Sequence, residues 1–323
     1  MSQLANNNEY FAISPLIIRP NSCAEFGVYL RHENYFVLFN AGGRTFTQDK
    51  RQELVNNNVL QVYIANRDRD LYRHYLLDNI SSVLDDESIP VAERAQAWTN
   101  SATVLGKELF EDNLPGPAFE KRYQRFEKLI ESTATFLQSP KSLKHLSSLI
   151  NKGYETYHHG ISTMVYAVTL MQEFEYDEYK TLTCGMGALI HDIGKAAIPA
   201  EIINQDPEKL EPDEKDILAL HPMVGARTCA TFNLPTIATN CILFHHERAD
   251  GKGYPTKAVS SDLPMHTKIV ALANTYDNLT RNQPYRKAMK PFQALKAIME
   301  DDGSTDTILL KKFIELLSRA KIT

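Results

Sequence analysis

The chain has 323 residues, of which 43% are hydrophobic and 23% charged, a composition typical of an ordinary globular protein. Its formal net charge of −5 argues against a nucleic acid polymer as the main partner, because binding to a phosphate backbone requires a basic surface. No apolar run reaches 18 residues, the N-terminus lacks a signal-peptide pattern, and the four cysteines form no CxxC pair. We therefore expect a cytoplasmic protein with reduced thiols and no membrane span.

Residues 1–70 predict a small regulatory or sensory domain that contains strands. Short apolar or alternating runs indicate strands at residues 16–18, 26–30, 35–39 and 59–64, and residues 48–55 indicate a short helix. No cluster of catalytic residue types occurs in this part of the sequence.

The hydrophobic period becomes helical after this domain. Residues 71–150 predict a helical connector, with helices at 91–109, 119–137 and 142–152, and this connector is also a candidate homodimer interface. Residues 151–323 predict an all-α catalytic domain. The expected fold class is therefore α+β, with a small α/β or β-rich domain ahead of a helical one.

Six of the ten histidines lie between residues 158 and 246, within four short motifs. Each motif alone has a structural explanation, such as a surface ion pair or a helix cap. Together they offer seven ligands, whereas a closed tetrahedral zinc site needs four, so we expect two or three metal ions. Because no thiolate lies nearby, the residue types suit Fe, Mn, Ni or Zn. The motifs are Glu155-Thr-Tyr-His158-His159, His191-Asp192-Ile-Gly-Lys195, His221-Pro222 and His245-His246-Glu247-Arg-Ala-Asp250.

These motifs, followed by Gly253-Tyr254-Pro255 and Gln283-Pro-Tyr-Arg286, resemble those of HD-GYP phosphodiesterases. The resemblance covers residues 153–288 and rests on motifs that are highly specific in this order and spacing. It implies the all-helical fold of the metal-dependent HD superfamily and hydrolysis of cyclic di-GMP to pGpG, often followed by GMP. Some members of the family act on cyclic GMP-AMP instead.

The resemblance also implies roles for individual residues. Asp192 matches the bridging carboxylate, Glu155 matches an extra ligand of members that bind three metals, and Lys195 matches a basic residue that contacts phosphate. The loop Gly253-Tyr254-Pro255 couples the site to partner proteins in the family. The implied metal ligands are Glu155, His159, His191, Asp192, His221, His245, His246 and, in the place of a family aspartate, Asn274.

Two positions depart from the family pattern. The family has Ala-Asp-x-x-Asp-Ala-Leu-Thr where this chain reads Ala273-Asn274-Thr-Tyr-Asp277-Asn-Leu-Thr280, and an amide oxygen binds a dication less strongly than a carboxylate. Asp277, three residues on, is either a compensating ligand or a capping or packing residue. Gln283 replaces a phosphate-binding arginine, which leaves Arg281, Tyr285 and Arg286 as candidate substrate contacts.

The expected mechanism has a hydroxide that bridges two metals attack phosphorus in line with the departing 3′ oxygen, with Asp192 and Lys195 as the catalytic side chains. Two alternatives stay open. Other HD-superfamily members are nucleotidases or (p)ppGpp hydrolases, but these lack the stretch from His245 to Pro255. A degenerate domain that binds a cyclic dinucleotide or a signalling partner without turnover would also explain Asn274 and Gln283.

Overall fold

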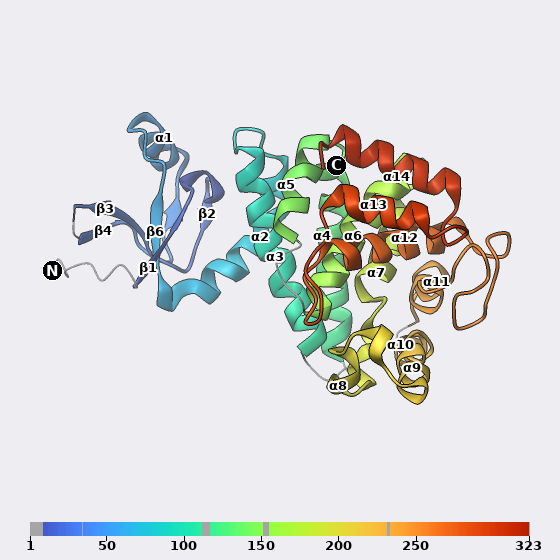
Figure 1. Ribbon diagram of the computed structural model, residues 1–323. Coiled ribbons are helices and arrows are strands. Elements are labelled where there is room, and N and C mark those ends of the chain that lie inside the picture. Colours follow the sequence, from blue (N-terminus) through green and yellow to red (C-terminus); the bar gives the residue numbers. More distant parts are fainter. Residues whose placement is uncertain (1–8, 34, 112–116, 151–154, 231–232, 323) are drawn as a thin grey trace. The chain divides into compact units, whose positions relative to one another are not determined.

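The computed structural model describes residues 9–33, 35–111, 117–150, 155–230 and 233–322, and the chain divides into two compact units, Met1–Val104 and Leu105–Thr323 (Figure 1). All the described strands lie in the first unit, and the described part of the second is helical, so the predicted α+β class is confirmed. Helix α2 (Arg69–Asp85) belongs to the first unit, and α3 (Val91–Glu111) crosses the boundary. The helices of residues 71–150 are therefore shared between the two units.

Four antiparallel strands form the main sheet of the first unit, in the order β1-β6-β3-β4. The β3–β4 hairpin pairs two runs rich in aromatic and β-branched residues, with Leu30 opposite Val37. Helix α1 (Gln48–Asn56) begins where the Thr47 side chain accepts a hydrogen bond from the Lys50 amide. The strands are β1 (Tyr10–Ile13), β2 (Ser22–Cys23), β3 (Val28–His32), β4 (Tyr35–Asn40), β5 (Thr45–Phe46) and β6 (Val62–Ala65), of which β2 and β5 pair separately.

The predicted strand at residues 16–18 is wrong. This segment forms the short 3₁₀ helix η1 (Pro15–Ile17), because Pro15 fixes the backbone of its first position and the Ser14 side chain accepts from the Leu16 amide. Ile17 and Ile18 are buried and Leu16 is half-buried, so the segment packs its apolar side chains as expected and only the backbone conformation differs. Strand β1 had no counterpart in the predicted elements.

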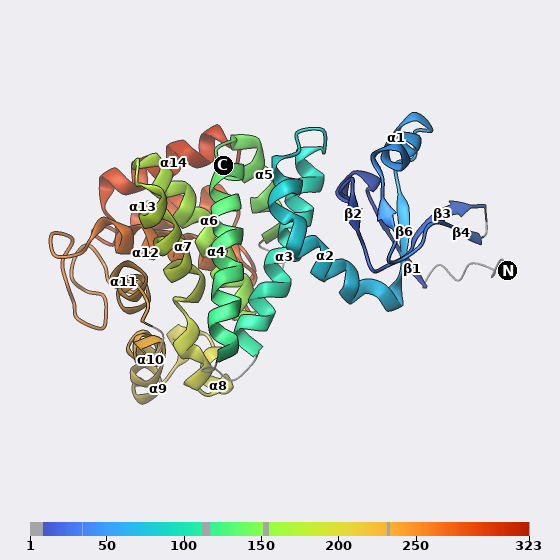
Figure 2. The same cartoon turned by 180° about the vertical axis from the view of Figure 1, so that it is seen from behind.

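The second unit is built around helix α6 (Thr156–Glu173), against which α4, α5, α7, α12 and α14 pack (Figures 1 and 2). All side chains of residues 159–171 are buried, which is typical of a central helix. Helix α7 (Glu178–Ile190) starts at the Asp177 cap and lies between α6 and α11 (Thr236–Phe244). Helix α12 (Met265–Thr280) packs on α6.

The remaining described elements are α-helices and short 3₁₀ turns. Helices α3 and α4 match the predictions for residues 91–109 and 119–137, and the predicted end of the next helix at residues 151–152 lies outside the described residues. No helix in the described parts of the chain is both long and apolar enough to cross a membrane. These helices are α4 (Pro117–Leu137), α5 (Pro140–Ile150), α8 (Ala200–Ile203), α9 (Pro212–Ala219), α10 (His221–Cys229), α13 (Pro291–Glu300) and α14 (Thr307–Arg319), with 3₁₀ turns η2 (Asn66–Asp68), η3 (Ile193–Ala197) and η4 (Pro207–Lys209).

Candidate metal centre

Five of the six histidines in the sequence motifs meet at the ends of helices in the second unit. His159 lies in the first turn of α6, His191 caps the C-terminus of α7, and His221 is the first residue of α10. His245 and His246 directly follow α11. Two groups result, each with ligand atoms within 4.8 Å of one another: His159, His191 and Asp192, and Asp192, His221, His245 and His246.

Close packing around Gly194 brings His221 into the site. Gly194 lies in η3, directly after the His191-Asp192 pair, and a Cβ atom on it would lie 2.0 Å from the main-chain oxygen of His221. Only glycine permits this approach. The residue therefore allows α10 to pack against η3 and to present His221 to Asp192.

Four of the histidines are oriented through Nδ1. A carbonyl oxygen or an ionised carboxylate accepts from each Nδ1–H, and in a neutral imidazole this leaves a lone pair on Nε2. Burial lowers the pKa of His159 and lowers the pKa of His245 to about 3, so these two rings are neutral near pH 7. The acceptors are Asp277 Oδ2 for His159, at 2.6 Å, and the oxygens of Ala188, Leu218 and Ile242 for His191, His221 and His245, at 2.6, 2.6 and 2.7 Å.

The Nε2 atoms converge in pairs. The His159 and His191 Nε2 atoms are 3.1 Å apart, and so are those of His221 and His245. Two lone pairs at this distance repel each other, whereas two nitrogen ligands about 2.0–2.1 Å from one ion are separated by about this amount. The donor set therefore fits a cation at each pair.

Asp192 lies between the two pairs with its side chain 2% exposed. Its Oδ1 is 3.2 Å from His221 Nε2 and accepts no hydrogen bond from the described residues. Its Oδ2 is 3.5 Å from His191 Nε2 and 2.7 Å from Lys195 Nζ. Burial opposes ionisation, but Lys195 and the surrounding imidazoles outweigh it and hold the pKa of Asp192 well below its usual range. A buried carboxylate with one oxygen toward each histidine pair is suited to bridge two divalent ions.

The loop after the second histidine pair completes this side of the site. The ring of His246 stacks on Tyr254 at 4.6 Å, and a Cβ on Gly253 would lie 2.5 Å from the oxygen of His246. Glu247, which we did not single out from the sequence, is buried and accepts hydrogen bonds from the amides of Thr256 and Ala258. It therefore fixes the path of the loop that follows Gly253-Tyr254-Pro255.

Helix α12 closes the side of the first pair. Asn274 is buried, and its Oδ1 lies 2.9 Å from His159 Nε2, so it faces the place of a cation beside His159 and His191. Asp277 binds His159 Nδ1 and, at 2.8 Å, Arg281 Nε. Asp277 thus contacts the Nδ1 side of His159 and orients this imidazole, a role that differs from the two predicted alternatives of a compensating ligand and a capping or packing residue.

Three of the predicted substrate contacts, Arg281, Tyr285 and Arg286, lie at or just beyond the C-terminus of α12. Arg281, expected to meet substrate phosphate, is 1% exposed and held by Asp277 and the Ser162 hydroxyl, because its position one turn after Asp277 directs it into the core. Arg286 donates to the carbonyls of Asn278 and Leu279 and caps the C-terminus of α12. Tyr285 is exposed on the loop beside it.

Glu155 is also separate from the two groups. Helix α6 begins at Thr156, so Glu155 is the N-cap with extended backbone and does not occupy a helical position four residues before His159. Its exposed carboxylate lies 3.6 Å from His158 Nε2. The Glu155 carboxylate therefore faces His158 rather than His159.

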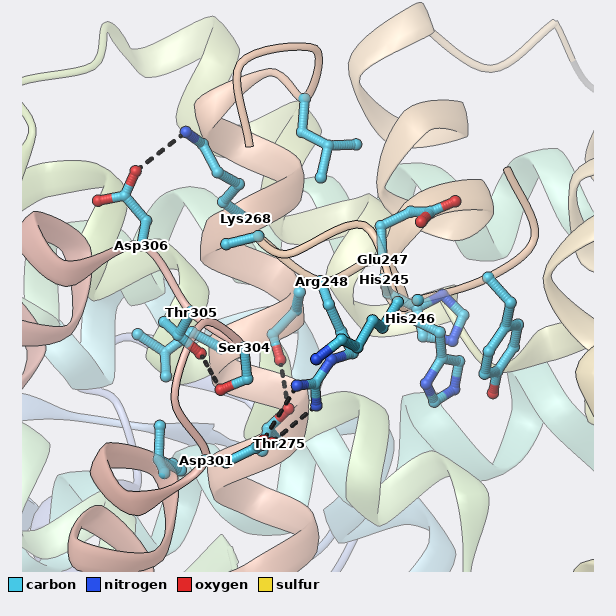
Figure 3. A pocket seen from close by; sticks show the side chains of 18 of the residues that line it. His245, His246, Glu247, Arg248, Lys268, Thr275, Asp301, Ser304, Thr305 and Asp306 are labelled. Atoms are coloured by element: carbon cyan, nitrogen blue, oxygen red, sulfur yellow. Dashed lines mark hydrogen bonds and ion pairs between the residues drawn. The ribbon is translucent and has the colours of Figure 1, made fainter. Parts of the chain in front are cut away.

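A separate cavity of about 410 Å³ adjoins the second histidine pair (Figure 3). It lies against a different face of α12, formed by residues such as Leu272 and Thr275. Its charged groups are already paired, Arg248 with Asp301 at 2.7 Å and Lys268 with Asp306 at 3.2 Å. The positive charge of Arg248 in this cavity is thus offset by carboxylates.

Known proteins resemble this chain in sequence and in fold. Residues 116–307, more than half of the chain, match a family model described as HD domain. The cyclic di-GMP phosphodiesterase PA4108 of Pseudomonas aeruginosa is 28% identical over 208 residues, which cover 64% of this chain and 50% of that protein. The cyclic di-GMP phosphodiesterase response regulator RpfG of Xanthomonas campestris pv. campestris is 35% identical over 120 residues, 36% of this chain and 32% of that protein.

The chain thus spans about half of the first of these relatives and less of the second. Among solved structures, Bd1817, an HDG"Y"P protein from Bdellovibrio bacteriovorus, aligns with a TM-score of 0.67 over 96% of this chain and 100% of that one. Its sequence identity of 23% supports a common fold.

Proposed function

Since this chain belongs to the HD domain family, we propose that it is a metal-dependent phosphodiesterase that hydrolyses cyclic di-GMP to pGpG, with GMP as a further product. The observation that carries the proposal is the Asp192 carboxylate, buried between two histidine pairs whose Nε2 atoms converge. The names of the relatives PA4108 and RpfG support the choice of substrate. A relative in Vibrio cholerae named as specific for 3'3'-cGAMP makes cyclic GMP-AMP the second substrate to test.

The metal site we propose holds two divalent ions, with Asp192 shared between them. His159 and His191 would bind one ion with Asn274, and His221, His245 and His246 the other. Such ions stabilise charge on phosphoryl oxygens and acidify bound water. The imidazole and carboxylate donors suit Fe, Mn, Ni or Zn.

The chain's own residues would position the substrate. Asp277 and the main-chain carbonyls orient the imidazoles and keep Nε2 free for a cation. The Lys195 ammonium, with its side chain 21% exposed beside Asp192, provides a positive charge for a non-bridging phosphate oxygen. A cyclic dinucleotide carries two phosphates, so a few cations suffice for binding despite the net charge of −5.

Two observations favour a second function, binding of a cyclic dinucleotide without turnover. Arg281 and Arg286, the arginines expected at the phosphates, are engaged by Asp277 and by main-chain carbonyls. An uncharged Asn274 beside His159 would also hold a dication less firmly. A domain that binds the dinucleotide without turnover is the alternative that fits these features.

One experiment separates the two functions. The full chain, purified anaerobically and loaded with a defined metal, is incubated with cyclic di-GMP or cyclic GMP-AMP, and products are separated by chromatography. Our proposal predicts pGpG from the wild type and none from a variant with His191→Ala and Asp192→Ala. Binding of cyclic di-GMP without any product would support the alternative.

We further propose that the protein acts in the cytoplasm, because its four cysteines are unpaired thiols. The roles of the Gly253-Tyr254-Pro255 loop as a docking site for a partner protein, of a homodimer, and of Glu155 as a third-metal ligand stay predictions from the family resemblance.

A further inference from the structure

Three side-chain amides form a continuous hydrogen-bonded chain from the surface to the first histidine pair. Gln283 Nε2 donates to Asn278 Oδ1 at 3.2 Å, and Asn278 Nδ2 donates to Asn274 Oδ1 at 2.8 Å. The same Asn274 oxygen lies 2.9 Å from His159 Nε2. The two positions that depart from the family pattern, Asn274 and Gln283, are thus the ends of one structure, which we call the amide chain (Gln283, Asn278 and Asn274).

The direction of these hydrogen bonds determines which atom Asn274 presents to the site. An amide can offer an oxygen, which binds a cation, or an NH₂ group, which does not. His159 donates its Nδ1 proton to Asp277, so its neutral Nε2 would accept from an NH₂ group just as readily. His159 alone would therefore favour the wrong orientation of Asn274 for a metal ligand.

Asn278 favours the orientation in which the oxygen of Asn274 faces the cation. Its NH₂ group donates to the Asn274 oxygen, and its own oxygen is occupied by the donor from Gln283. Turning Asn274 alone would place its NH₂ group against that of Asn278, so Asn274 can reverse only if Asn278 and Gln283 reverse with it. An aspartate at position 274, as in the family pattern, needs no neighbour to orient it, because both terminal atoms of its carboxylate are oxygens.

We propose that Asn278 is a positioning residue that, supported by Gln283, holds the Asn274 amide with its oxygen toward the cation beside His159 and His191. The inference rests on the metal centre of the proposed function and concerns how this chain binds metal without an aspartate at position 274. The amide chain fixes which atom faces the cation, although the amide does not restore the lost negative charge.

Metal affinity in four versions of the full chain tests this role. Mn²⁺ binding is measured by titration, with free Mn²⁺ followed by electron paramagnetic resonance, for the wild type, Asn278→Ala, Asn274→Asp and the double variant. Loss of an orienting group around a metal ligand weakens binding about 10–100-fold, so we expect Asn278→Ala to weaken the first site about tenfold in the wild-type background. In the Asn274→Asp background, we expect less than about a twofold change, because a carboxylate presents oxygen in either orientation.

Two further variants test the outer link of the amide chain and the loss of an amide outside it. Gln283→Ala, one link further along the amide chain, is expected to weaken Mn²⁺ binding by a smaller factor of about threefold. Asn282→Ala, which removes a nearby exposed amide that accepts from the Ala288 main chain, is expected to change nothing. Circular dichroism checks that each variant is folded, and Gln283→Ala carries the test alone if Asn278→Ala is not.

Equal weakening by Asn278→Ala in both backgrounds, or none in either, would overturn the proposal, since a packing role does not depend on residue 274. Failure of the proposed hydrolysis is a distinct outcome. In that case Mn²⁺ binding would show the background-dependent difference while cyclic di-GMP remained intact.

Discussion

Asp192 is the one side chain common to both groups of potential ligands. Its two oxygens face different histidine pairs, and the Lys195 ammonium lies 2.7 Å from its Oδ2. A bridging role requires both oxygens and the full negative charge, which an amide of the same shape cannot supply. A substitution of Asp192 is therefore the sharpest test of the proposed metal centre.

We expect Asp192→Asn to lower divalent metal affinity at least about 100-fold, more than the loss of an orienting group would. Elemental analysis after dialysis should show loss of more than one ion per chain, because both sites share this residue. The matched control is Asp216→Asn on the exposed face of α9, which should retain all metal. Unchanged metal content in Asp192→Asn would exclude the shared carboxylate.

At the scale of elements, the site depends on how closely helices approach. Gly194 sits against the start of α10, where the nearest backbone atom leaves no room for a methyl group. The position of His221 is thus set by packing between η3 and α10 as much as by its own helix. A change on η3 that never touches the histidine should still displace it.

We predict that Gly194→Ala lowers the free energy of unfolding by about 3 kcal/mol and weakens metal binding by the group that contains His221. Gly225→Ala, on the facing helix, meets a side-chain carbon of Ile242 at 3.1 Å and the main-chain nitrogen of Gly194 at 3.2 Å, so it should cost less than Gly194→Ala, about 1 kcal/mol. Chemical denaturation of metal-free protein measures both effects. Equal stability of the two variants would contradict the packing argument.

In the first unit, Asp86 joins three elements. It follows α2 and pairs with Arg19 at 2.6 Å and with Arg51 of α1 at 3.1 Å, while the Ser88 amide and hydroxyl donate to its Oδ1. Burial opposes ionisation, but the Ser88 hydrogen bonds and both arginines hold the pKa of Asp86 well below its usual range. Its contribution to stability is therefore present above about pH 4 and is lost as the pH falls through the lowered pKa.

We expect Asp86→Asn to lower the free energy of unfolding by about 2 kcal/mol at pH 7. The difference from the wild type should shrink progressively as the pH falls below about 4, because the carboxylate of the unfolded wild type then takes up a proton that the folded protein resists binding. Asp85→Asn, at the exposed neighbouring position, serves as the control. A difference that stayed constant over this pH range would argue against the ion pairs as its cause.

For the whole molecule, the sequence predicted the fold class and the six residues that meet in the two groups, because contiguous motifs carry that information. It did not predict the orientations of Arg281 and Arg286. Those depend on a turn of α12 that faces the core and on a loop that folds back onto the helix end. Nor does the sequence predict that α6 begins one residue after Glu155, because a helix boundary depends on local capping rather than on periodicity.

The sequence did not predict the amide chain either. Asn274 and Gln283 stood out as separate departures, and only the structure shows Asn278 between them. Their spacing of four and five residues is compatible with contact on and just beyond one helix, but it does not say which amide atoms face one another. Three uncharged residues thus share one role that no motif describes.

The central claim is that two metals held around Asp192 support hydrolysis of cyclic di-GMP. The most direct measurement takes one anaerobic sample of the full chain, determines its metal content by elemental analysis, and follows cyclic di-GMP and pGpG by chromatography. Our account predicts two ions per chain and steady conversion to pGpG, both abolished by Asp192→Asn. A sample that holds two ions and binds cyclic di-GMP, yet leaves it intact across Fe, Mn, Ni and Zn, would contradict the account.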